Sequence, residues 1–147
     1  MLRSSVGTKQ ETRSRTCPLV LFSVGGRRLA VKSDEVAGIS EWTDSIPVPS
    51  RTPFVAAIVR REQQVFPVFD LAGLLGVSVQ GEHLLCLTVK HPHGAMALCI
   101  DEEMPVLHSL DPAAIQAYRG TDLEAVGSFT SGFDQIPILS MTRLAAA

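Results

Sequence analysis

The sequence predicts an all-β protein built from one or two small barrels. Short apolar runs alternate with turns along nearly the whole chain, which is the pattern of successive β-hairpins. Helical periodicity is confined to three short pieces, Asp70–Leu75, Pro112–Tyr118 and Met141–Ala146. Strands that are this short and this closely spaced are typical of small barrels.

Four hairpins account for most of the chain. The first joins PLVLFSV to RRLAV through Gly25-Gly26, whose glycines can adopt the positive φ that a tight turn needs. The others join FVAAIVR to QVFPVF, LLCLTVK to AMALCI, and EAVGSFT to QIPILSM. After the second of these hairpins, Asp70 is placed to cap a short helix over Leu71–Leu75, and Gly76 is placed to end it.

An internal repeat predicts two lobes. Leu29–Glu35 aligns with Met96–Glu102 at an offset of 67, and Phe66–Leu71 aligns with Ile136–Met141 at an offset of 70. We expect lobes at roughly residues 30–80 and 84–140, with the termini completing the barrels. Because lobes of this size bury too little surface alone, a shared interior between them is expected.

Composition and charge exclude several classes of protein. The 46% hydrophobic and 19% charged content of the 147 residues is that of a globular protein. Residues 1–16 carry four basic residues and one acid and are predicted to be a disordered basic tail. The rest has nine basic and fourteen acidic residues, a net charge of −5 that fits nucleic acid poorly. The chain shows neither a signal peptide nor a membrane-spanning run, which predicts a cytoplasmic location.

No metal or cofactor site is predicted. Cys86, His91, His93 and Cys99 flank one hairpin, but they lack the paired short spacing of zinc ligands. Cysteines inside apolar runs are better interpreted as buried reduced thiols.

No catalytic residue is predicted either. Asp34-Glu35 and Asp101-Glu102-Glu103 lie at strand ends, where adjacent carboxylates point to opposite faces, so we interpret them as solvated turns and helix caps. The chain contains no nucleophile elbow and no glycine-rich phosphate loop.

The remaining candidate for function is the surface. Arg60-Arg61-Glu62-Gln63 form the turn of a hairpin whose strands are otherwise apolar. Charged residues are the default at a hairpin tip, but this cluster could also set partner choice through charge complementarity. Small barrels with exposed edges commonly bind partners by adding strands or packing apolar patches.

At this point the residues resemble the CheW-like adaptors of bacterial chemosensory arrays, over about Leu19 to Leu144. Pro53-Phe54-Val55, followed by VFPVFDL and then Leu75-Gly76, is similar to the family's P-F-V…V-I-P-V-(V/I)-D-L-x-x-x-L-G segment. GAMALCIDEEMPVL, with Asp101 at the family's aspartate, and AVGSFTSGFDQIPILSMTRL look like its later segments.

The resemblance implies two five-stranded SH3-like barrels packed side by side with short helices, and no catalysis. It implies a scaffold between the cytoplasmic tip of a methyl-accepting chemoreceptor and the regulatory domain of a CheA-type histidine kinase. In such adaptors a groove between the lobes serves the receptor and the lobe ends serve the kinase. Other CheW-like proteins are further possible partners.

The sequence departs from the family pattern at several positions, including Ala57 and Ser140, where the family has a glycine and an aspartate. The family's N-L-R-G becomes Arg60-Arg61-Glu62-Gln63, so its arginine is a glutamate, and its V-x-E-I becomes Val36-Ala37-Gly38-Ile39, so its glutamate is a glycine. The paired change indicates a re-specified partner surface, although the turn could simply have drifted. We predict that surface to comprise Val36, Gly38, Ile39, Ile58, Arg60, Arg61, Glu62, Gln63 and Val65.

Three alternatives to a coupling adaptor stay open. The chain could bind receptor but have lost kinase coupling. It could be a small β-barrel ligand-binding or enzyme domain unrelated to signalling, or an array filler that contacts only its own kind.

Overall fold

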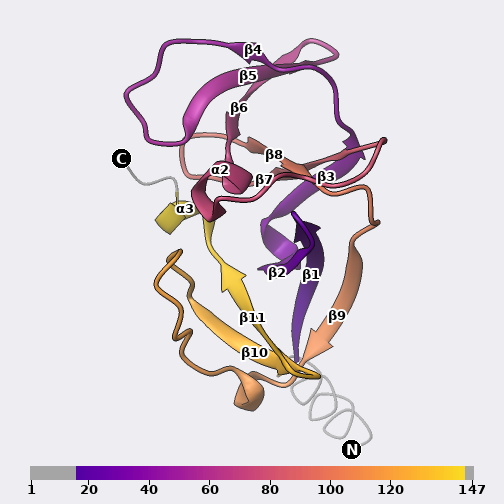
Figure 1. Ribbon diagram of the computed structural model, residues 1–147, viewed down its shortest axis with the longest axis vertical. Coiled ribbons are helices and arrows are strands. Elements are labelled where there is room, and N and C mark those ends of the chain that lie inside the picture. The colour runs from indigo at the N-terminus through magenta and orange to yellow at the C-terminus, as the bar shows by residue number, and fades with distance from the viewer. Residues whose placement is uncertain (1–15, 145–147) are drawn as a thin grey trace, which may run out of the picture.

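The computed structural model describes residues 16–144, which fold into two curled β-sheets, one above the other in Figure 1. One sheet contains, in spatial order, β3 (Val36–Glu41), β7 (Leu85–Val89), β8 (Met96–Ile100), β6 (Gln64–Phe69), β5 (Val55–Arg61) and β4 (Ile46–Pro47). The other contains β10 (Gly127–Ser131), β11 (Asp134–Leu139), β2 (Arg27–Lys32), β1 (Cys17–Val24) and β9 (Val106–Leu110). The predicted all-β class is confirmed.

All four predicted hairpins form as antiparallel pairs, β1–β2, β5–β6, β7–β8 and β10–β11. Three strands were not predicted, β3, β4 and β9. In β3 a glycine interrupts the apolar pattern, β4 has only two residues, and polar side chains break up β9.

The helices are short, as expected. Their bounds are Ser33–Glu35 for η1, Leu71–Leu75 for α2, Pro112–Ala114 for η2 and Met141–Leu144 for α3. The Asp70 side chain accepts a hydrogen bond from the Gly73 backbone amide at 2.9 Å, and Gly76 ends α2 with φ 69°, which confirms the predicted caps. The helix predicted over Pro112–Tyr118 is reduced to the three-residue η2. Residues 1–15 of the predicted tail, and the end of the predicted C-terminal helix, lie outside the described residues.

The internal repeat is visible in the sheet topology. The order β5-β6-β8-β7-β3 in one sheet matches β10-β11-β2-β1-β9 in the other. In each sheet a parallel contact joins the proline-containing strand to a hairpin from the other half of the chain, Val68 to Ala97 in one and Ile138 to Ala30 in the other. The two halves therefore exchange their first hairpins.

This exchange corrects the expected lobe boundaries. The hairpin β7–β8 was assigned to the second lobe, but it pairs with β3 and β6 of the first. Conversely, β1 and β2 complete the sheet of β9, β10 and β11. A sequence repeat reports that two segments are alike, but it cannot report which copy's hairpin completes which barrel.

The expected shared interior is present between the sheets. Val20, Phe22 and Val24 on one face of β1 belong to a cluster that also contains residues of β7 and β8. Leu19 and Leu21, on the other face of β1, belong to a separate cluster inside the five-stranded sheet. Because β1 is covered on both faces, its apolar residues are consecutive rather than alternating.

A buried carboxylate ties the two sheets together. Asp101, at the end of β8, is only 4% exposed. It accepts hydrogen bonds from the backbone amides of Gly25, Gly26 and Gln80, each at 2.8 Å. The first two amides belong to the β1–β2 turn of the opposite sheet, so the carboxylate spans the joint between the sheets.

Asp101 therefore departs from the solvated turn that the sequence suggested. A carboxylate can be buried where several amide donors replace its hydration. The turn is built for this contact because Gly25 has φ 62°, and a Cβ there would come within 2.6 Å of Val77. Asp34, Glu102 and Glu103 are exposed, as expected.

Replacing Asp101 by Asn should destabilise the fold. Asn has almost the same shape, but its amide group would face a backbone amide where the carboxylate oxygen now accepts. We expect the free energy of unfolding to fall by about 2–4 kcal/mol, measured by urea denaturation. Glu103→Gln removes an exposed carboxylate two residues away and should change it by less than about 0.5 kcal/mol. Equal effects of the two substitutions would contradict the role given to Asp101.

Candidate partner-binding groove

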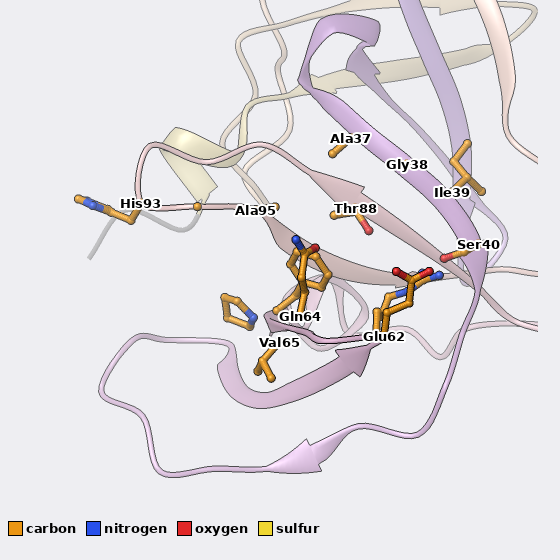
Figure 2. A pocket seen from close by; sticks show the side chains of 14 residues that line it. Ala37, Gly38, Ile39, Ser40, Glu62, Gln64, Val65, Thr88, His93 and Ala95 are labelled. Carbon is orange, nitrogen blue, oxygen red and sulfur yellow. The ribbon is translucent and has the colours of Figure 1, made fainter.

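A groove of about 770 Å³ lies between β3 and the β5–β6 hairpin (Figure 2). Ala37–Ser40 of β3 form one wall. Arg61, Glu62 and Gln64–Pro67 form the opposite wall, and Thr88 of β7 also lines the groove. The groove therefore lies within the six-stranded sheet, on the surface of one lobe.

The groove brings together five of the nine residues predicted as a partner surface. These are Gly38, Ile39, Arg61, Glu62 and Val65. They come from two segments more than twenty residues apart in the sequence, and the curl of the sheet makes them face one another.

The other four predicted residues do not line the groove. Val36 is half-buried and packs against the cluster between the sheets. Ile58 is half-buried in β5, opposite Pro67 of β6. Arg60 and Gln63 are exposed on the same hairpin.

The sequence interpretation missed several lining residues, among them Ser40, Gln64, Thr88 and His93. Thr88 lies beside Gly38 only because β3 pairs with β7, a strand from the other half of the chain. No local pattern could have indicated that pairing. Gln64 directly follows the predicted turn, so extending the predicted surface by one residue would have included it.

The backbone of Glu62 adopts an uncommon conformation. Its φ is 54°, in the left-handed region that favours glycine. Glu62 and Gln63 are the two turn residues between the paired Arg61 and Gln64. In the equivalent turn of the second repeat, between Ser131 and Asp134, the same position is occupied by Gly132, with φ 64°.

The groove is open opposite Glu62. Gly38 lies next to a register shift in the β3–β7 pairing, and a Cβ built on it would have no neighbouring heavy atom within 4 Å. Figure 2 shows the Glu62 side chain reaching from the hairpin towards the strand that carries Gly38 and Ser40. The Ser40 hydroxyl oxygen is buried and has no hydrogen-bond partner among residues 16–144.

The charges in the groove are mixed and unpaired. Arg61 and Glu62 are neighbours in the chain, yet neither side chain makes a hydrogen bond or ion pair within the described part of the protein. The rim is apolar, because Ile39 is 40% exposed and Val65 is 55% exposed. An open groove with an apolar rim and unpaired charges suits the binding of a protein segment.

The chemistry of the cysteines adds no nucleophile. Cys86 and Cys99 face each other across the β7–β8 pair and are free thiols, as is Cys17. Burial raises the pKa of the Cys99 thiol to about 12, so the reactive thiolate is scarce at neutral pH. Residues 16–144 contain no group of three or more His, Cys, Asp or Glu side chains arranged to hold a metal ion.

Comparison with known proteins identifies the class. The model of the CheW-like domain matches residues 18–146, so the chain belongs to the CheW-like family. A similar solved structure is that of the scaffolding protein TtCheW from Thermoanaerobacter tengcongensis, with a TM-score of 0.74 and 16% identity. The match covers 90% of this chain and 94% of that one, and it establishes the fold of two SH3-like lobes.

A comparison with curated proteins gave no match. Among the helices of residues 16–144, none combines the length and the apolar character that crossing a membrane requires.

Replacing Glu62 by Gly should stabilise the protein. The substitution relieves left-handed strain of about 1–2 kcal/mol, offset in part by the greater freedom of glycine in the unfolded chain. We expect the free energy of unfolding to rise by about 0.5–1 kcal/mol in urea denaturation.

The matched control is Gly132→Ala at the equivalent turn, where a Cβ meets no neighbouring atom and only the φ is unfavourable. It should lower the free energy of unfolding by about 1 kcal/mol. If both substitutions changed stability in the same direction, the strain assigned to Glu62 would be wrong.

Proposed function

We propose that the protein is a non-catalytic adaptor in a bacterial chemosensory array, acting in the cytoplasm. In this role it links the cytoplasmic tip of a chemoreceptor to the regulatory domain of a CheA-type histidine kinase. Membership of the CheW-like family over residues 18–146 supports the proposal. Likeness in fold to a scaffolding protein over nearly the whole chain supports it further.

The partner surface we propose is the groove between β3 and the β5–β6 hairpin, extended over the hairpin by Arg60 and Gln63. The observation that carries this assignment is the convergence of Gly38, Ile39 and Glu62 on one groove. Gly38 and Glu62 depart from the family's sequence pattern, and Ile39 is the neighbour of Gly38 in the chain. Because both walls of the groove differ from the family pattern, the groove is suited to a partner that is specific to this adaptor.

A second candidate function is receptor binding without kinase coupling. It is favoured by Glu62 and Gly38, because both members of the family's arginine–glutamate pair have changed. The adaptor would then occupy receptor tips and leave the kinase unattached.

A binding assay separates these possibilities. The purified protein is incubated with the receptor cytoplasmic domain and the kinase regulatory domain of the same cell, separately and together, and complexes are isolated by size-exclusion chromatography. Binding to both indicates a coupling adaptor, and binding to receptor alone indicates the second candidate. Binding to neither would contradict the proposed function.

The groove itself is tested by filling it. Gly38→Trp places an indole in open space, so folding should be preserved while the affinity for the partner falls at least tenfold. Ala113→Trp, on the exposed η2 in the other lobe, is the control and should leave the affinity unchanged. Isothermal titration calorimetry with each domain gives both affinities, and equal affinities for the two variants would exclude the groove as the binding site.

A further inference from the structure

The most informative feature of the groove is a carboxylate kept where glycine would be more stable. Glu62 and Gly132 occupy the same position in two equivalent hairpin turns, with φ values of 54° and 64°. One repeat uses the residue that suits this backbone, and the other holds a charged side chain there at a conformational cost. A strained residue that persists in a binding groove is an indication of function.

The surroundings of Glu62 fit a cation from outside the chain. Within residues 16–144 its carboxylate has no ion pair or hydrogen bond, even though Arg61 adjoins it. On the facing wall Gly38 leaves space for an incoming side chain. Ile39 and Val65, which also line the groove, are 40% and 55% exposed.

Arg61 adds a second requirement. Arg61 lines the same groove, and its guanidinium is also unpaired within the described residues. A partner that supplied only a basic side chain would leave the positive charge of Arg61 without a counter-charge and would be repelled by it. A partner that brings a basic and an acidic side chain would match both charges.

We infer that the groove binds a segment of a partner protein that presents a basic side chain to Glu62 and a neighbouring acidic side chain to Arg61. The inference deepens the proposed function, on which it rests, because it states the chemistry of the partner at the same groove.

The test uses the full-length protein and the receptor and kinase domains described above. For the domain that binds, affinity is measured for the wild type and for Glu62→Gln, which keeps the shape of the side chain and removes its charge. We expect a loss of at least tenfold, which becomes smaller as salt is raised because ion pairing is screened. Glu41→Gln, an exposed carboxylate at the end of β3, is the matched control and should bind like the wild type.

Glu62→Gly separates binding from folding. The inference predicts that this variant is more stable than the wild type and yet binds at least tenfold more weakly, so unfolding cannot explain the loss. Glu62→Arg should abolish binding, and replacing one basic residue of the partner by Glu should restore it.

The possible failures are distinct. If the wild type binds its partner and Glu62→Gln binds equally well, the inferred ion pair is wrong while the adaptor function stands. If the wild type binds neither domain, both the proposed function and the inferred ion pair are wrong.

Discussion

The arrangement of the two lobes depends on one buried carboxylate. Asp101 replaces its lost hydration with three backbone amides, two of them from the β1–β2 turn of the opposite sheet. This contact sets the distance across which the apolar faces of β1, β7 and β8 pack. Because β7 also carries β3, the same joint holds one wall of the groove in place. The position of the groove therefore depends on how the two lobes are joined.

The repeat makes the divergence of the two halves visible within one molecule. Both halves contain an antiparallel hairpin with a two-residue turn, whose second strand contains a proline and is followed by a short helix. One turn has a glycine and a fully exposed Phe133, while the other has Glu62 beside two arginines. The two turns therefore share a backbone geometry and differ in the chemistry of their side chains.

Much of this could be predicted from the sequence, because local patterns determine local structure. The glycine turns predicted the hairpins, and the aspartate before a leucine-rich run predicted the cap of α2, because each depends on neighbouring residues. The exchange of hairpins between lobes and the pairing of β3 with β7 could not be predicted, because they depend on contacts between distant segments. For the same reason the burial of Asp101 was missed, since its amide donors lie more than twenty residues away in the sequence. Among the groove residues that were predicted, Arg61 and Glu62 were first indicated by the charged hairpin turn, whereas Gly38, Ile39 and Val65 followed from the family resemblance.

The most direct test of the account is a map of the bound surface by NMR. Unlabelled partner domain is titrated into the ¹⁵N-labelled protein, and the backbone amide shifts are followed residue by residue. We expect the largest shifts at Ala37–Ser40 and Arg61–Val65, with little change at the Gly132–Phe133 turn of the other lobe. Shifts centred on that turn, with β3 unaffected, would contradict the assignment of the groove as the partner surface.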